Sequence, residues 1–189
     1  MPTGSSTRRR PAKASSSSTE PVTGRIVQIN VSPGGVPKRP VPRARVTRSG
    51  IEGDRHRDAE HHGGPDRALC LFSLEQIEAL QAEGHRVEPG ALGENLTLVG
   101  LDWPRVQPED FFRLGDEVLV QITRLTSPCL NVRAAFLDGT YSRVFQKQHP
   151  GWSRAYARVL VPGEIAAGDP AERLTPAEVT RHLAVGLGG

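Results

Sequence analysis

The segment from Gly53 to Leu69 holds more side chains able to do chemistry than any other stretch of the chain. It reads GDRHRDAEHHGGPDRAL and contains three histidines, three arginines and three glycines. Apolar residues do not recur there at the period of a helix or a strand, so core packing does not explain it. Because glycine lets backbone N–H groups approach a ligand and arginine binds anions, the composition favours a polar ligand pocket. A solvated loop is the alternative interpretation.

Cys129 is the candidate nucleophile or metal ligand of this chain. It follows Pro128 just past the clearest predicted strand and precedes a predicted helix start. A cysteine in that place can be partly exposed and have its thiolate favoured by helix N–H groups. A thiolate acts as a nucleophile, a sulfur carrier or a soft metal ligand, and the alternative is a small buried hydrophobe. Cys70 lies in the apolar run ALCLF, and we expect it in the core.

The histidines His56, His61 and His62, with nearby aspartates, could form a zinc or iron site. Their spacing, His-x4-His-His, matches no standard metal motif and lacks the helical context that places i and i+4 ligands on one face. Hydrogen bonds to a bound anion, or structural bonds across Gly63 and Gly64, are the roles that we expect instead.

Two arginines of the segment, Arg55 and Arg67, flank its glycines and are candidate phosphate clamps, since guanidinium groups match phosphate oxygens. Surface ion pairs with the aspartates of the same segment are the alternative. Further along the chain, Asn95 stands in the run GENLT. Its amide could hydrogen-bond the edge of a heterocycle or hold a turn.

The charge of the chain is concentrated near its beginning. Of 189 residues, 37% are hydrophobic, and the net charge is +3 with a pI near 9.2. The excess comes from Arg8, Arg9, Arg10 and Lys13, and the remainder is close to neutral. Specific nucleic-acid binding by the folded part therefore has little electrostatic support. We expect residues 1–22, rich in Ser, Thr, Arg and Pro, to be a disordered, solubilising tail.

The sequence also favours a location. No apolar run follows the early arginines, as a secretory signal would require, and none approaches the roughly eighteen apolar residues of a transmembrane helix. Two cysteines are too few for a disulfide scaffold. We expect a cytoplasmic protein with no membrane partner.

Short apolar or alternating runs bounded by Gly and Pro predict most of the strands. A Pro162-Gly163 turn makes the last two of these runs a hairpin candidate. The segment 36–46, which holds three prolines, suits a sheet edge, and Trp103 to Asp110 is expected to be irregular. The predicted strands are Arg25 to Val31, Val46 to Ile51, Ala68 to Phe72, Leu96 to Val99, Val118 to Leu125, Tyr156 to Val161 and Glu164 to Ala167.

The predicted helices are few and short. Ser73 and Gln76 form a capping box that opens a helix through Ala82. A second capping box, at Thr175 to Glu178, opens a C-terminal helix. Two short helices are expected at 132–137 and 141–148. With no βαβ rhythm, this pattern predicts a mainly β (α+β) fold, an open or closed β-barrel with short flanking helices.

The expected organisation has three parts. Residues 1–22 form the tail, residues 23–174 form the domain, and residues 175–189 form a helical extension.

In order along the chain, these motifs resemble the MOSC domain, which occurs at the C-terminus of molybdenum-cofactor sulfurases and as stand-alone bacterial proteins. The resemblance spans about residues 24–174, nearly the whole predicted domain. The matching motifs are Gly53 to His56, His62 to Ala68, Gly93 to Thr97, Gly115-Asp116, Pro128-Cys129, Tyr156 to Leu160, Gly163-Glu164 and Gly168-Asp169.

The resemblance implies a β-rich barrel that binds a molybdenum cofactor of the molybdopterin type. It implies that Cys129 is the molybdenum ligand or a persulfide carrier. It also implies a set of residues along the pterin and phosphate, namely Arg55, His56, His62, Gly63, Asp66, Arg67 and Asn95.

Three functional hypotheses follow. The first is an oxidoreductase that reduces small N-hydroxylated compounds with electrons from a separate reductase, since the chain shows neither a cysteine set for an iron–sulfur cluster nor a dinucleotide fingerprint. The second is a sulfur carrier supplied by a cysteine desulfurase, with a persulfide on Cys129. The chain shows no desulfurase half, so pyridoxal phosphate is not supported as its cofactor. The third is a zinc-dependent hydrolase using His56, His61 and His62.

The chain departs from the family pattern at two places. Family members often carry an arginine three residues before the cysteine, where this chain has Thr126. Whether Arg124 substitutes for it is left open. Many members also carry a glycine just before the aromatic residue of the last strand, where this chain has Arg154 and Ala155. These departures leave the expected fold intact and weaken the assignment of a substrate.

Overall fold

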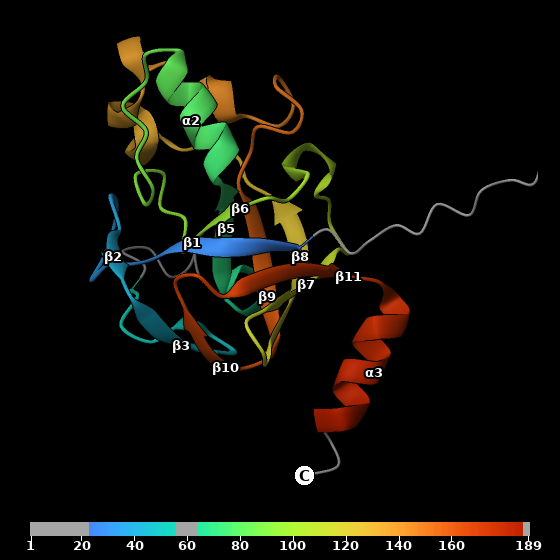
Figure 1. Ribbon diagram of the computed structural model, residues 1–189. Helices are drawn as coiled ribbons and strands as arrows, with labels where there is room; N and C mark the ends of the chain where they lie inside the picture. Colours follow the sequence, from blue (N-terminus) through green and yellow to red (C-terminus); the bar gives the residue numbers. More distant parts are fainter. Residues whose placement is uncertain (1–22, 56–63, 187–189) are drawn as a thin grey trace, which may run out of the picture.

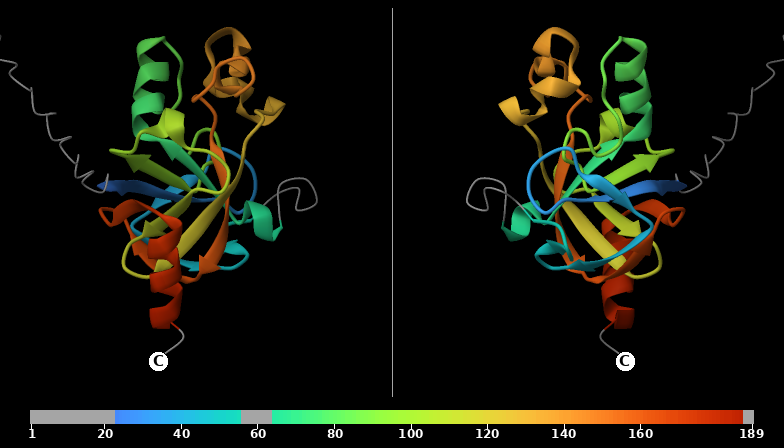
Figure 2. Two further views of the ribbon diagram at one scale, coloured as in Figure 1. Left: turned by 90° about the vertical axis from the view of Figure 1, so that its right-hand side faces the viewer. Right: turned by 90° about the vertical axis from the view of Figure 1, so that its left-hand side faces the viewer.

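The computed structural model describes residues 23–55 and 64–186, and its centre is a closed β-barrel (Figures 1 and 2). Seven strands of these residues form the ring, because β11 pairs with both β7 and β1. Their order around the ring is β1 (Thr23–Val31), β6 (Leu96–Val99), β5 (Leu69–Ser73), β9 (Ala155–Val161), β8 (Val118–Leu125), β7 (Phe111–Leu114) and β11 (Pro170–Leu174). Neighbours are antiparallel except β5 and β6, which are parallel.

Four further strands lie outside the ring. The strand β2 (Arg39–Val41) pairs with the far end of β1, and its proline at position 40 suits the edge predicted for this segment. A separate three-stranded sheet has the order β10 (Gly163–Ala166), β3 (Arg43–Thr47) and β4 (Gly50–Ile51). Closure of the ring leaves few unpaired strand edges in the barrel itself.

Alternation along the strands decides which side chains fill the barrel. In β9 the residues Ala155, Ala157 and Val159 are buried, whereas Tyr156 and Arg158 between them are partly exposed. Successive side chains of a strand point to opposite faces, so the first group faces the core and the second faces outward. The core also holds large side chains from the other strands, including Phe72, Phe112, Ile26, Leu71 and Leu114.

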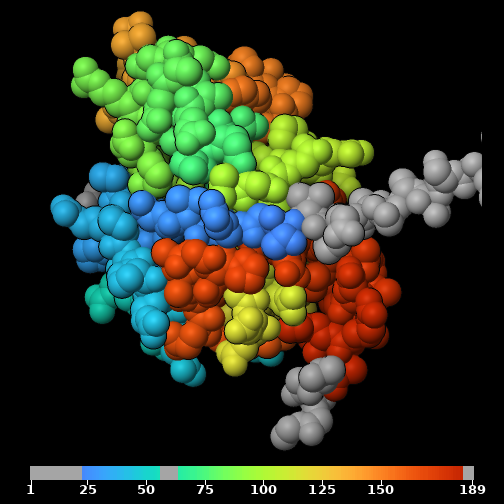
Figure 3. Space-filling model, in the orientation of Figure 1, coloured from blue at the N-terminus to red at the C-terminus, as the bar shows by residue number. Residues whose placement is uncertain are grey.

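The helices stand at opposite ends of the barrel (Figures 1 and 3). At one end lies α2 (Leu74–Ala82), whose N-cap Ser73 accepts a hydrogen bond from the Gln76 N–H at 3.3 Å, as the capping box predicted. The short 3-10 helices η3 (Leu130–Ala135), η4 (Leu137–Gly139) and η5 (Tyr141–Val144) stand beside it (Figure 2). At the other end lies α3 (Pro176–Gly186), whose predicted capping box is also present. Two more 3-10 turns are η1 (Pro65–Arg67) and η2 (Trp103–Arg105).

The mainly β barrel with short helices is confirmed, and so are most of the predicted strands. One prediction is wrong: β10 does not form a hairpin with β9 but pairs with β3, with Ile165 opposite Ala44. The reason is that β9 is already paired on both sides, with β5 and β8, and has no free edge. The predicted strand at 46–51 is instead parts of two strands, β3 and β4, joined by a turn. The strands β7 and β11 were not predicted.

Among the described residues, no helix is both long enough and apolar enough to cross a membrane. The expected tail at 1–22 lies outside the described residues. The division of the chain at residues 22 and 174 stays a prediction.

Candidate functional site

Cys129 lies where the chain leaves the barrel towards η3. The last backbone contact of this edge joins the Thr126 N–H to the Arg154 carbonyl at 2.8 Å, between the end of β8 and the start of β9. Cys129 comes three residues later, is half-buried, and is the N-cap residue of η3. It therefore occupies the barrel end that carries α2 and η3 to η5.

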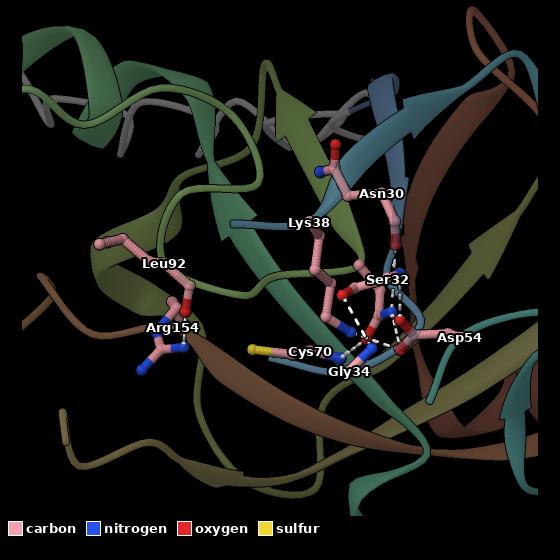
Figure 4. A network of polar contacts seen from close by, with 9 residues as sticks. Asn30, Ser32, Gly34, Lys38, Asp54, Cys70, Leu92 and Arg154 are labelled. Atoms are coloured by element: carbon pink, nitrogen blue, oxygen red, sulfur yellow. Dashed lines mark hydrogen bonds and ion pairs between the residues drawn. The ribbon is translucent and has the colours of Figure 1, made fainter. Parts of the chain in front are cut away.

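A buried polar network ties the start of the Gly53 segment to the barrel (Figure 4). Lys38 and Asp54 form an ion pair whose side chains are only 5% and 3% exposed. The other carboxylate oxygen of Asp54, Oδ1, accepts a hydrogen bond from the Ser32 N–H at 2.8 Å. The Asn95 amide donates to Asp54 Oδ2 at 2.8 Å and to the Asn30 carbonyl at 3.3 Å. Contacts from Ser32, Lys38 and Asn95 therefore hold this carboxylate in place.

The same network reaches Cys70, which is buried as expected. Its backbone N–H donates to Asn95 Oδ1 at 3.0 Å. Cys70 is opposite Tyr156 in the β5–β9 register, so its side chain lies on the outer side of the barrel wall. Burial raises the pKa of the Cys70 thiol, while the neighbouring Arg154 and Lys38 charges act in the opposite direction. In Figure 4 the Cys70 sulfur points towards the Arg154 guanidinium.

Arg154 and Glu94 are buried charged residues that sequence reasoning did not single out as site residues. Arg154 donates through Nη1 to the Leu92 carbonyl (Figure 4). Glu94 Oε1 accepts a hydrogen bond from the Gly90 N–H at 2.6 Å. Burial raises the pKa of Glu94. A signal was present in the sequence, since Arg154 directly precedes the alternating pattern of β9, where a charged residue at a buried position is unusual.

Cationic side chains surround Tyr156 on the outer face of β8, β9 and β5. The Arg124 guanidinium lies 5.5 Å from the centre of the Tyr156 ring. Burial raises the pKa of the Tyr156 phenol, and Arg154, Arg67 and Arg124 act in the opposite direction. Within residues 23–55 and 64–186, neither Arg67 nor Arg124 forms an ion pair with a carboxylate. As far as the described residues show, both guanidinium groups are therefore available to an anion.

The remaining candidates are placed as follows. Asp66 is exposed, pairs with Arg158 at 3.1 Å, and accepts a hydrogen bond from Thr123 at its carbonyl. Arg55 is exposed, and its N–H donates to the Ser32 carbonyl at 2.8 Å. Neither Arg55 nor Arg67 forms an ion pair with Asp54 or Asp66 as far as the described residues show, and Asp58, the third aspartate of the alternative interpretation, lies outside them.

Other expected site residues, His56, His61, His62 and Gly63, lie outside the described residues. Among the residues that are described, no group of three His, Cys, Asp or Glu side chains could hold a metal ion. The zinc hypothesis therefore rests on residues about which the structure gives no information.

A groove of the described residues lies elsewhere. It has a volume of about 990 Å³ and lies between α3 and the end of β9 opposite to Arg154, with Leu160, Val161 and Leu183 among its lining residues. It contains none of the candidate residues, so its size does not make it the functional site.

Comparison with known proteins identifies the family. A sequence model of the MOSC domain matches residues 58–172, more than half of the chain. The chain belongs to the MOSC domain family. The MOSC domain is associated with molybdenum-cofactor-related proteins. The matched residues of this chain include Arg67, Asn95 and Cys129.

Relatives of this MOSC domain include two bacterial proteins and a fungal one. It is 36% identical over 146 residues to YflK of Bacillus subtilis, covering 76% of this chain and 65% of that protein. It is 33% identical over 132 residues to YiiM of Escherichia coli, covering 67% and 57%. A Gibberella moniliformis protein named reductase is 31% identical over 127 residues, which cover 64% of this chain and 22% of that protein. The chain thus spans less than two thirds of the length of these relatives.

Solved structures support the same fold. The crystal structure of YiiM from Geobacillus stearothermophilus has a TM-score of 0.62 and 27% identity, covering 80% of this chain and 75% of that chain. The crystal structure of the Escherichia coli YiiM has a TM-score of 0.60 and 28% identity, covering 80% and 70%. The MOSC barrel expected from the sequence is therefore confirmed.

Proposed function

We propose that this MOSC domain binds a molybdenum cofactor and reduces N-hydroxylated compounds with electrons from a separate reductase. The observation that carries the proposal is the half-buried Cys129 at one barrel end together with Arg67 and Arg124 on the neighbouring barrel wall, neither of which has a carboxylate partner among the described residues. A relative named reductase supports a reduction, rather than an oxidation, as the proposed reaction. A cytoplasmic location, where thiols stay reduced, belongs to the same proposal.

The donor set fits the two ends of such a cofactor. A cysteine thiolate is a soft ligand that suits a thiophilic metal. Guanidinium groups bind phosphate through paired, charge-assisted hydrogen bonds. Cys129 would hold the metal, and Arg67 and Arg124 would hold the phosphate. Asn95 keeps its amide inside the protein, so its contacts support a role in positioning Asp54 and Cys70, and its ligand binding stays a prediction.

When bound, the cofactor supplies the two-electron redox chemistry that the protein side chains lack. Reduction of an N-hydroxylated compound breaks the N–O bond, takes up two electrons and two protons, and releases water. The electrons come from the partner reductase. Because burial raises the pKa of Tyr156, its phenol stays protonated at neutral pH and is a hydrogen-bond donor on the outer wall beside Arg124.

The test compares wild type, Cys129→Ser and Ser127→Ala, all purified from a host that makes the cofactor. Ser127 is exposed and two residues from the cysteine, so its variant controls for changes in the loop. For each protein we measure the molybdenum content, the pterin content and the rate at which an amidoxime, an N-hydroxylated compound, is reduced with a reduced viologen dye as electron donor. We expect all three to be present in wild type and Ser127→Ala and lost in Cys129→Ser.

Other outcomes select the other hypotheses. Wild-type protein without molybdenum but with cyanide-releasable sulfur on Cys129 would contradict the reductase and support the sulfur carrier. Stoichiometric zinc, with Cys129 free to react with an alkylating agent, would support the zinc hydrolase.

A further inference from the structure

Two buried cations act on the Cys70 side chain, and within the described residues only Lys38 forms an ion pair. Lys38 is paired with Asp54. Arg154 is 6% exposed and lies on the other side of the Cys70 sulfur in Figure 4. Within residues 23–55 and 64–186, no carboxylate forms an ion pair with Arg154. A buried charge without a partner is strongly unfavourable, so Arg154 calls for an explanation.

Glu94 does not supply the missing charge. Its field reaches Arg154, but the two residues form no ion pair among the described residues. Glu94 Oε1 accepts hydrogen bonds from the Gly90 N–H and the Thr97 hydroxyl, and its Oε2 is buried with no hydrogen-bond partner in the described parts of the chain. Burial raises the pKa of Glu94 and so favours the neutral acid. No carboxylate of the described residues is therefore in ion-pair contact with the Arg154 guanidinium.

Two hydrogen-bond donor atoms at this point also lack partners among the described residues. Arg154 Nε and Thr126 Oγ1 are buried and make no hydrogen bond within the described parts of the chain. Their residues are neighbours, since the Thr126 N–H donates to the Arg154 carbonyl at 2.8 Å. Buried polar groups are normally satisfied by protein, water or ligand. A guanidinium N–H and a hydroxyl are both donors that suit an oxyanion.

The place of these two residues connects them to Cys129. They stand at the barrel end from which the Cys129 loop leaves, and only Ser127 and Pro128 separate Thr126 from the cysteine. They are also the positions of the two departures from the family pattern noted in the sequence. The contact between the Thr126 N–H and the Arg154 carbonyl brings these two positions together, and the guanidinium at this barrel end comes from the residue directly before β9.

We propose that Arg154 and Thr126 form an oxyanion-binding subsite beside Cys129. The Arg154 guanidinium supplies the charge and the Thr126 hydroxyl a further donor, and the ligand is a phosphate or carboxylate group. The subsite itself does not depend on the proposed function. Only the source of the oxyanion, cofactor or substrate, rests on it.

Inorganic phosphate is the probe for the subsite, used with full-length protein from a host that cannot make the cofactor. Phosphate binding is measured by calorimetric titration and by the rise in melting temperature. Arg154→Gln removes the charge and keeps an N–H donor for the Leu92 carbonyl. We expect it to lower phosphate affinity by about 10- to 100-fold and to abolish the rise in melting temperature. Arg105→Gln, at a side chain 79% exposed, is the matched control and keeps both.

If Arg154 only stabilised the fold, Arg154→Gln would lower the melting temperature without phosphate and leave the phosphate affinity unchanged. Without phosphate, we expect Arg154→Gln to melt no lower than wild type, because it removes an unpaired buried charge. Equal phosphate affinity in wild type and Arg154→Gln would overturn the proposal. Arg154→Lys, which keeps the charge without the fork, should retain more affinity than the glutamine variant.

A relocated arginine provides a second test that does not depend on one variant. Arg154→Ala leaves space beside Thr126. Adding Thr126→Arg then places a guanidinium at the end of β8, next to the position that Arg154 occupied. We expect the double variant to bind phosphate about tenfold or more tightly than Arg154→Ala alone. A folded double variant with no recovery would contradict the shared subsite.

The source of the oxyanion is decided with protein from a cofactor-producing host. Loss of molybdenum and pterin from Arg154→Gln assigns the subsite to the cofactor. Unchanged molybdenum, with a raised KM and unchanged kcat for a carboxylate-bearing amidoxime, assigns it to the substrate. If neither changes, the subsite has no part in the proposed function. Absence of molybdenum from wild type defeats the proposed function and leaves the phosphate result standing.

Discussion

Asn95 Oδ1 accepts a hydrogen bond from the backbone N–H of Cys70 at 3.0 Å, which joins the loop before β6 to strand β5. The same amide donates to Asp54 and to the Asn30 carbonyl. One side chain therefore holds together β1, β5 and the start of the Gly53 segment. The arrangement explains why a polar residue 1% exposed stands in the wall of the barrel.

Replacing Asn95 by Ala should destabilise the protein. The change leaves the Cys70 N–H and the Asn30 carbonyl without a buried partner, and each such loss costs about 1–3 kcal/mol. We expect the free energy of unfolding in urea to fall by about 2 kcal/mol or more. Asn131→Ala, at an exposed position, is the control and should change it by less than about 0.5 kcal/mol. An unchanged free energy of unfolding for Asn95→Ala would show that the amide has no structural role.

The buried ion pair of Lys38 and Asp54 gives a second prediction. Lys38→Met leaves the Asp54 carboxylate buried without its cation, and breaking a buried pair in this way costs about 3–5 kcal/mol. The double variant Lys38→Met/Asp54→Asn should recover a large part of that loss in the free energy of unfolding. The exposed pair of Arg45 and Glu164 is the comparison, where Arg45→Ala should cost less than about 1 kcal/mol. Equal losses at the two pairs would contradict this interpretation.

Glu94 gives the stability of the protein a pH dependence of predictable sign. Burial raises the pKa of Glu94 above its ordinary value of 4.5. Below pH 4.5 the carboxyl is protonated in both the folded and the unfolded chain, and its contribution is fully present. Above that pH the unfolded chain releases the proton first, so the free energy of unfolding falls until the pH passes the raised pKa of the folded state.

The measurement is a set of urea unfolding curves between pH 4 and 8 for wild type and Glu94→Gln. Glutamine can still accept the Gly90 hydrogen bond but does not titrate. The loss of stability with rising pH should therefore be smaller in Glu94→Gln than in wild type. Parallel pH profiles would exclude Glu94 as the source.

Local sequence signals predicted the parts of the fold that are determined locally. The strand Val118–Leu125 and the strand Leu96–Val99 have the predicted bounds because their apolar runs are flanked by turn residues. Ser73 predicted the start of α2 through its own side chain. The strand Pro170–Leu174 was missed because it begins with a proline and alternates weakly, and it depends on pairing with β1 and β7 on its two sides.

The residues of the candidate site also divide into those with a local sequence signal and those that depend on distant contacts. The place of Cys129 at the barrel end was predictable because it follows a strand end in the sequence, and its role in binding stays a prediction. Arg154 was not predicted, because its burial results from contacts such as that with the Leu92 carbonyl, 62 residues away. Lys38 is likewise buried only because the chain returns to it at Asp54. Burial that depends on distant contacts leaves only a weak local sign, which for Arg154 is its place directly before the alternating pattern of β9.

The central claim, that this MOSC domain binds molybdenum and that Cys129 is one of its ligands, is tested most directly by X-ray absorption at the molybdenum edge. Wild type and Cys129→Ser are purified from a cofactor-producing host, and the sulfur donors around molybdenum are counted in each. We expect the serine variant either to contain no molybdenum or to show one sulfur donor fewer than wild type. The same sulfur count and the same molybdenum content in both proteins would contradict the claim.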